Sequence, residues 1–280
     1  MHLIDTHAHL NFNNYKEDSD EVIRNALREQ VWMINVGAEY KTSKRALDIA
    51  NKYSTGVYAA IGLHPIHLIE QKHKEEGAEF VSRAEEFNYD VYEKLASFEK
   101  VVAIGEIGLD YYHMPVGEDS GPIKEKQKQV FYEQMLMARR IDKPVIIHCR
   151  QAHDDMVEVI EDFRKENKDI IPKDRFWGVL HCFSGDEDLA WKYFSFGLIV
   201  SFTGLITFSR QWDDLIRRLP NDRFMIETDC PFMTPEPYRG HRNEPRLVKF
   251  VAQRIAEIKN LSTERIAELS TANARRLFNI

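Results

Sequence analysis

The sequence predicts an α/β protein with the closed (β/α)8 architecture of a TIM barrel. Short apolar or β-branched runs alternate with longer amphipathic, charged stretches along the whole chain, and this alternation is typical of parallel strands joined by crossover helices. Eight such units within 280 residues match the usual length of this barrel. No linker rich in Pro, Gly or Ser divides the chain, so we expect one domain over residues 1–280. A doubly wound open sheet is the alternative, but no glycine-rich phosphate loop follows the first apolar run.

The strands of the barrel are expected in the short apolar runs, which are rich in Val, Ile and Leu. Each run has the length of a buried strand and is followed by a polar or turn-forming segment. The expected strands are His2–Thr6, Trp32–Gly37, Gly56–Gly62, Val101–Gly105, Pro144–His148, Phe176–His181, Leu198–Phe202 and Arg223–Thr228.

The helices are expected in the longer stretches, where apolar residues recur at helical spacing. The last one opens with a Ser262 or Thr263 cap and is expected to pack on the outside of the barrel. Two charged excursions, Glu70–Ser97 and Tyr111–Pro122, would follow strand ends, on the face where loops build active sites. The expected helices are Asp20–Gln30, Thr42–Lys52, Ile123–Ile141, Asp154–Asn167, Glu187–Phe196, Gln211–Leu219, Glu244–Lys259 and Thr263–Phe278.

The composition limits the classes of partner. A formal net charge of −7 argues against an extended phosphate-binding surface, although divalent metals can supply local positive charge. No apolar run approaches the roughly 20 residues that span a bilayer, and no secretory signal is recognisable. Three cysteines are too few for a disulfide framework, so we expect free thiols. We therefore expect a cytoplasmic protein with no membrane association and no obligate protein partner.

Polar residues gather where the expected strands end. The opening segment MHLIDTHAHL places His7 and His9 one residue apart, and residues i and i+2 of a strand point to the same side. Because the carboxyl ends of parallel strands converge on one mouth of a barrel, we expect the strand-end side chains to meet there. The polar residues at these ends are Asp5, His7, His9, His64, Glu106, Asp110, His148, Arg150, His181, Glu227 and Asp229.

The set of imidazoles and carboxylates predicts a metal centre. Mixed ligands of this kind suit zinc, manganese and related divalent ions without selecting one. Six ligand-type groups exceed the needs of one four-coordinate ion, so two ions bridged by a carboxylate fit better. Taken singly, Glu106 could instead pair with Arg150, and Asp229 could cap a turn before Pro231. The candidate ligands are His7, His9, Glu106, His148, His181 and Asp229.

The remaining histidines and the cysteines are expected to have structural roles. Cys149, Cys182 and Cys230 each directly follow a candidate ligand, and strand alternation should turn them away from the barrel axis. A Cys–His nucleophile is the alternative for these thiols. The histidines without a companion pattern are His2, His67, His73, His113, His153 and His241.

The blocks IDTHAHL, AIGEIGLDYY, VIIHCR, HCFSG and IETDCPFMTPEPYRGHRNEP resemble the signature segments of the TatD-like metal-dependent deoxyribonucleases, which belong to the amidohydrolase-type barrels. The resemblance extends over nearly the whole chain, and it implies that the six candidate ligands hold a divalent metal pair, with Glu106 as the bridging carboxylate. It also implies hydrolysis of phosphodiester bonds in DNA, in several members from the 3′ end. The chain departs from the family in its longer, less basic loop after GLDYY, its enlarged 70–97 excursion, and His241 where lysine is common.

These residues define a mechanistic hypothesis for DNA ends or single-stranded DNA as substrate. Two Mg²⁺, Mn²⁺ or Zn²⁺ ions would activate a water near neutral pH. Glu106 and Asp229 are the candidate catalytic carboxylates, and Asp229 would take the proton of that water. His64, Arg150 and Arg242 are candidates to hold phosphate oxygens, although Arg242 could instead form an ion pair with Glu236 or Glu244. The other hypotheses are a hydrolase of small esters, lactones or amides that uses the same metal pair, and a non-catalytic barrel that binds a partner.

Overall fold

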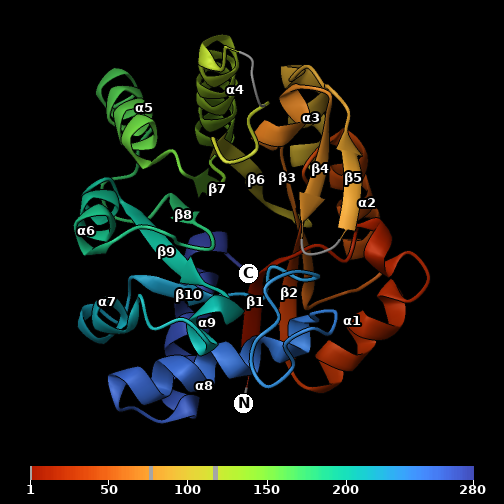
Figure 1. The fold of residues 1–280 in the computed structure, drawn as a ribbon, viewed down its shortest axis with the longest axis vertical. Coiled ribbons are helices and arrows are strands. Elements are labelled where there is room, and N and C mark those ends of the chain that lie inside the picture. The colour runs from red at the N-terminus through yellow and green to blue at the C-terminus, as the bar shows by residue number, and fades with distance from the viewer. Residues whose placement is uncertain (1, 76–77, 116–118) are drawn as a thin grey trace.

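The computed structural model describes residues 2–75, 78–115 and 119–280, with no description of the side chains of 72–80. Eight parallel strands follow one another around the sheet in chain order, and helices surround them (Figure 1). A parallel bridge between Ala8 and Cys230 joins the first strand to the segment after the last one, which closes the barrel. The predicted TIM barrel is thereby confirmed. The strands are β1 (Leu3–Ala8), β2 (Val31–Val36), β3 (Val57–Ile61), β6 (Val101–Asp110), β7 (Val145–Arg150), β8 (Gly178–Leu180), β9 (Leu198–Phe202) and β10 (Phe224–Ile226).

The helices that were predicted from apolar spacing are all present, with ends that differ by a few residues. The expected helix Glu244–Lys259 begins as a short 3-10 turn at Pro245–Leu247 before α8. None of the helices within the described residues is long and apolar enough to cross a membrane. The predicted helices are α1 (Ser19–Arg28), α2 (Tyr40–Ala50), α4 (Gly121–Arg140), α5 (His153–Glu166), α6 (Glu187–Ser195), α7 (Asp213–Arg218), α8 (Val248–Lys259) and α9 (Thr263–Phe278).

The two excursions have different structures. Residues 70–97 contain a β-hairpin of β4 (Gln71–Glu75) and β5 (Ala78–Ser82), followed by α3 (Tyr89–Ala96). The sequence analysis gave no element in this segment. In the 111–122 excursion, residues 116–118 lie outside the described residues, and the last two residues already belong to α4, which has Pro122 in its first turn.

The barrel interior is apolar at the amino ends of the strands, and α9 closes the barrel there. Every strand of the barrel contributes at least one buried side chain to a single cluster, and α9 adds three more. Asn273 of α9 also donates a hydrogen bond to the carbonyl oxygen of Phe224 at the start of β10, at 2.8 Å. The expectation that this helix packs on the outside of the barrel is therefore wrong, because its apolar face covers the amino ends of the strands. The cluster comprises Ile4, Ile34, Val36, Ala60, Val102, Ala103, Ile146, Val179, Ile199, Met225, Ala274, Leu277 and Phe278.

Irregularities in β1 and β6 turn the functional side chains inward. Between Asp5 and Ala8, β1 makes three residue steps while its partner β2 makes two. An unbroken strand would place Ile4 and His7 on opposite sides, but this bulge lets both face the interior. A similar shift of β6 against β7 falls between Ile104 and Ile107, immediately around Glu106. These two bulges therefore bring His7 and Glu106 into the interior at the carboxyl end of the barrel.

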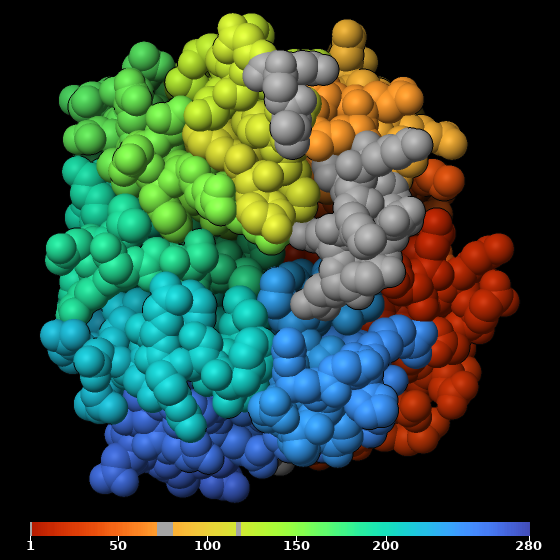
Figure 2. All heavy atoms as spheres, viewed as in Figure 1, coloured from red at the N-terminus to blue at the C-terminus, as the bar shows by residue number. Residues whose placement is uncertain are grey.

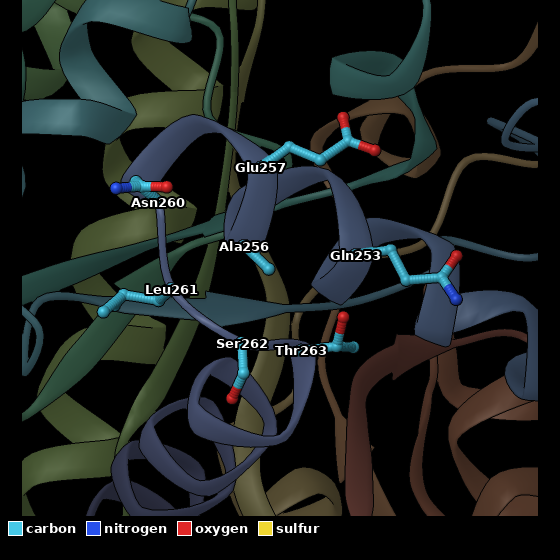
Figure 3. Close-up of a pocket in the computed structure, with 7 residues that line it drawn as sticks. All are labelled: Gln253, Ala256, Glu257, Asn260, Leu261, Ser262 and Thr263. Atoms are coloured by element: carbon cyan, nitrogen blue, oxygen red, sulfur yellow. The ribbon is translucent and has the colours of Figure 1, made fainter.

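A pocket of about 370 Å³ lies away from the barrel interior, at the turn between α8 and α9 (Figure 3). Asn260 ends α8 in the left-handed conformation, and the Ser262 side chain accepts a hydrogen bond from the backbone of Arg265 at the start of α9. Glu257 is the one carboxylate among the lining residues, and no lining residue is His or Cys. The pocket is thus a product of the helix caps and is separate from the metal-ligand candidates.

Phe278→Ala should destabilise the protein by about 3–5 kcal/mol, because Phe278 is 3% exposed and fills the closed end of the barrel. Urea denaturation followed by circular dichroism would measure the loss. Arg276→Ala, an exposed position of the same helix, is the matched control and should change the stability by less than about 0.5 kcal/mol. Equal effects of the two substitutions would show that α9 does not seal the barrel.

Candidate metal centre

The structure brings all six predicted ligands together at the carboxyl end of the barrel. His7 lies in β1 and His9 directly follows it, Glu106 lies in β6, His148 lies in β7, and His181 directly follows β8. Asp229 follows β10 and is held close to β1, because its backbone N–H donates to the carbonyl oxygen of His7 at 2.8 Å. His148 is partly buried, and the other five are buried. Together with His64, which groups with Glu106 and His148, the six residues form three overlapping sets whose ligand atoms lie within 4.8 Å of one another.

The Glu106 carboxylate lies between two groups of histidines. Its Oε2 atom is 3.4 Å from His7 Nε2 and 3.9 Å from His9 Nε2. Its Oε1 atom is 2.9 Å from His148 Nδ1 and 2.7 Å from His181 Nε2. One oxygen therefore faces each group, which is the arrangement of a carboxylate that can bridge two cations.

The first group consists of His7, His9 and Asp229. The Nε2 atoms of the two histidines are 3.1 Å apart, and Asp229 Oδ1 is 3.3 Å from His9 Nε2. The Nδ1 atom of His9 is 2.9 Å from the carbonyl oxygen of Val36, which can only accept a hydrogen bond. Nδ1 of a neutral His9 ring consequently carries the proton, and the Nε2 lone pair points into the site. This orientation suits a metal ligand.

The second group, His148 and His181, is oriented by two further carboxylates. His148 Nε2 is 3.0 Å from Asp110 Oδ2, so a neutral ring donates there and presents its Nδ1 lone pair to the site. His181 Nδ1 lies 3.5 Å from Glu227 Oε1. Glu227 is held in turn by the backbone N–H of Cys182 at 2.6 Å and by the Ser201 hydroxyl at 2.7 Å. Asp110 thus supports the candidate ligand His148 through a hydrogen bond, and Glu227 faces the candidate ligand His181 as a neighbouring charge; the sequence analysis gave neither carboxylate this role.

His64 also lies at the site, but it turns an N–H toward the centre, whereas His9 and His148 turn a lone pair toward it. Its Nδ1 atom accepts a hydrogen bond from the backbone N–H of Ile66 at 3.2 Å, which caps the short helix Pro65–Leu68. The proton of a neutral ring is therefore on Nε2, which lies 3.3 Å from Glu106 Oε1. His64 offers a donor where the six ligand candidates offer lone pairs or anionic oxygens. This geometry is compatible with its predicted role of holding a phosphate oxygen.

The two predicted phosphate-binding arginines lie in different segments of the chain. Arg150 ends β7, and its Cζ atom is 3.8 Å from the centre of the Tyr112 ring. Arg242 donates two hydrogen bonds to the Asp18 carboxylate, at 3.0 and 2.5 Å, and lies 4.0 Å from Glu244. The sequence analysis considered Glu244 as an ion-pair partner of Arg242 but missed Asp18. A role of either arginine in binding phosphate stays a prediction.

His113 was expected to have no companion, and this expectation is wrong. Its Nδ1 atom is 2.8 Å from Asp110 Oδ2, and its backbone N–H donates to Asp110 Oδ1 at 2.9 Å. Asp110 is therefore held by the loop after β6 while it orients His148. The spacing of three residues between Asp110 and His113 was the available signal in the sequence.

The charges of the site depend on one another. Burial alone would raise the pKa of the Glu106 carboxyl, but the rings of His181, His64 and His7 hold that pKa well below its usual value. Burial opposes the charge of His181, yet Glu106 and Glu227 raise its pKa well above the usual value. Asp229 also has a lowered pKa, since the hydrogen bond from His9 and the neighbouring rings outweigh its burial. A divalent ion would replace the extra protons of His9 and His181, the pKa values of which are raised.

Cys149 Sγ lies 3.3 Å from His153 Nδ1, but burial disfavours the thiolate form of all three cysteines. Cys230 is buried and Cys149 and Cys182 are partly buried. Burial raises the pKa of each of the three thiols to about 12, so the thiolate is scarce at neutral pH. This chemistry favours the structural role over the Cys–His alternative.

A TIM barrel with converging imidazoles and carboxylates at its carboxyl end is an arrangement typical of metal-dependent enzymes, among them hydrolases. The family model described as TatD related DNase matches residues 4–279. The uncharacterized metal-dependent hydrolase YabD of Bacillus subtilis is 40% identical over 99% of both chains, and YcfH of Escherichia coli, named in the same way, is 31% identical over 100% of this chain and 97% of its own.

Solved structures agree with these relatives. The TatD homologue YjjV of Escherichia coli superposes with a TM-score of 0.81 at 29% identity, over 99% of this chain and 98% of that one. A TatD family hydrolase of Entamoeba histolytica gives 0.78 at 25% identity over the same shares. The chain belongs to the TatD family and is a metal-dependent hydrolase.

Asp110→Asn should lower the affinity for divalent metal by about 10–100-fold, the usual effect of losing the support of a histidine ligand. Both carboxylate oxygens of Asp110 accept hydrogen bonds, so either orientation of an amide places an NH₂ group against a donor. Titration calorimetry with Zn²⁺ or Mn²⁺ measures the change. Asp119→Asn, on the exposed part of the same loop, is the control. Unchanged affinity in Asp110→Asn would contradict the orienting role.

Proposed function

We propose that this protein hydrolyses phosphodiester bonds at the ends of single-stranded DNA, as a 3′–5′ exodeoxyribonuclease with two divalent ions. The observation that carries the proposal is the position of Glu106, with one oxygen toward His7 and His9 and the other toward His148 and His181. Two divalent ions held on either side of this carboxylate would stabilise the attacking and leaving oxygens of a phosphodiester. The description of the matching family as DNases supports DNA as the substrate.

Asp229 is the residue that takes the proton of the attacking water in this proposal. Bound divalent ions supply Lewis-acid stabilisation and make that water acidic. The lowered pKa of Asp229 keeps its carboxylate ionised at neutral pH, and Oδ1 lies 3.3 Å from His9 Nε2. Its side chain is 12% exposed, against 6% for Glu106 and 0% for His7. The Asp229 side chain is therefore more accessible to an incoming water than the side chains of Glu106 and His7.

The substrate is held by donors on the rim of the site. His64 presents Nε2–H to the oxygen of Glu106, and a phosphate oxygen that approaches this position would accept the same proton. Arg150 follows the ligand His148 by two positions and adds a guanidinium near the same strand ends. The formal charge of −7 offers no long basic track for duplex DNA. Short unpaired ends fit this distribution of charge.

Cleavage of a labelled single strand tests the proposal. With Mg²⁺, Mn²⁺ or Zn²⁺, a 5′-labelled oligonucleotide should shorten stepwise, whereas a 3′-labelled one should release its label at once as a mononucleotide. EDTA should abolish both reactions, and Glu106→Gln should do so too because a neutral amide cannot balance two dications.

Turnover of a lactone or simple ester without any EDTA-sensitive cleavage of DNA would assign the metal centre to a small-molecule hydrolase instead. Release of the label from the 5′ end first would reverse the proposed direction.

A further inference from the structure

Two exposed aromatic rings lie on segments that follow barrel strands at their carboxyl ends, and each has a guanidinium over its ring. Tyr112 follows β6, its side chain is 52% exposed, and Arg150 Cζ lies 3.8 Å from the ring centre. Phe208 follows β9 through the short helix Gly204–Thr207, is 39% exposed, and has Arg239 Cζ 3.9 Å from its ring centre. Each ring is therefore oriented by an arginine while much of its surface faces solvent.

These pairs are unusual among the described residues. They are the two shortest guanidinium–ring distances in that part of the chain, since the others begin at 4.4 Å. Phe98 and Trp191 are also exposed aromatic residues, with 47% and 45% exposure, but no described cation lies over either ring. Close arginine stacking on an exposed ring thus coincides with the loops at the carboxyl end of the barrel.

The Tyr112–Arg150 pair lies at the ends of the two strands that carry Glu106 and His148, and the Phe208–Arg239 pair joins the segment after β9 to the loop after Asp229. Tyr112 lies two positions after Asp110, which orients His148, and Arg150 lies two positions after His148 itself. The segment of Phe208 is locked against the loop after Asp229, because a Cβ atom at Gly204 would lie 2.1 Å from the carbonyl oxygen of Met233. The yellow segment after β6, the cyan segment after β9 and the blue segment after β10 meet on one face of the molecule (Figure 2).

An exposed ring that a guanidinium holds in place is suited to stacking with an unpaired nucleobase. Bases stack on aromatic side chains with little sequence preference, and a nearby guanidinium can neutralise the adjoining phosphate. Such local charge matters in a chain whose formal charge is −7. We propose that Tyr112 and Phe208, each backed by its arginine, are stacking platforms for the unpaired bases of a single DNA strand whose end enters the metal centre. This inference rests on the proposed nuclease function and specifies how its substrate is held.

Binding of a fluorescein-labelled oligothymidine tests the platforms. Fluorescence anisotropy in EDTA measures the affinity without cleavage, and an abasic strand of the same length keeps the phosphates but lacks the bases. Tyr112→Leu and Phe208→Leu should each weaken binding of the oligothymidine by about five-fold or more, while the abasic strand binds each variant as it binds the parent protein. Tyr112→Phe and Phe208→Tyr keep a ring and should bind like the parent, and Trp191→Leu controls for the loss of an exposed aromatic residue.

Two results would overturn the inference. One is an equal loss of affinity for the oligothymidine and the abasic strand, which would assign the effect to phosphate contacts or to the fold. The other is unchanged affinity in both leucine variants. A parallel cleavage assay on the metal-loaded parent protein separates the two proposals. If the parent cleaves DNA but the leucine variants bind the oligothymidine as tightly as the parent, only the stacking platforms are contradicted. If the variants lose affinity for the oligothymidine alone but the parent cleaves no DNA, only the nuclease function is contradicted.

Discussion

The site depends on one buried carboxylate, Glu106, which lies within 4 Å of five histidine rings. Burial alone would disfavour the ionised carboxylate, so its charge has to be balanced by protonated rings or by metal ions. The surrounding structure fixes which nitrogen of each ring faces inward. Val36 and Asp110 turn lone pairs of His9 and His148 toward the centre, while Ile66 turns the proton of His64 toward it. These hydrogen bonds therefore decide which histidines can bind a cation through a lone pair and which one can donate a proton to a hydrogen bond.

The barrel makes this arrangement possible by dividing its interior into two layers. Apolar side chains from every strand fill the lower layer, and α9 seals it with Ala274, Leu277 and Phe278. Bulges in β1 and β6 change the side of the strand that faces inward, so His7 and Glu106 reach the upper layer above this apolar base. Apolar packing at the amino ends of the strands stabilises the fold, so the carboxyl ends can carry polar side chains that take part in catalysis.

Much of the fold and of the candidate site could be predicted because strong local patterns encode them. Leu198–Phe202 is a short, β-branched apolar run of strand length, and the observed β9 has the same bounds. The six ligand candidates could be brought together because parallel strand ends must meet. The hairpin of β4 and β5 was missed because its strand QKHKE has no apolar alternation. The place of α9, the pairing of His113 with Asp110 and that of Arg242 with Asp18 depend on tertiary contacts that no local pattern contains.

The central claim is that Glu106 joins two cation sites, and an anomalous-scattering map of crystals soaked in Mn²⁺ or Zn²⁺ tests it most directly. The account predicts two peaks on either side of this carboxylate. One should lie among His7, His9 and Asp229 next to Oε2, and the other should lie between His148 and His181 next to Oε1. A single peak that engages both oxygens of Glu106, or peaks that do not contact Glu106, would contradict the account.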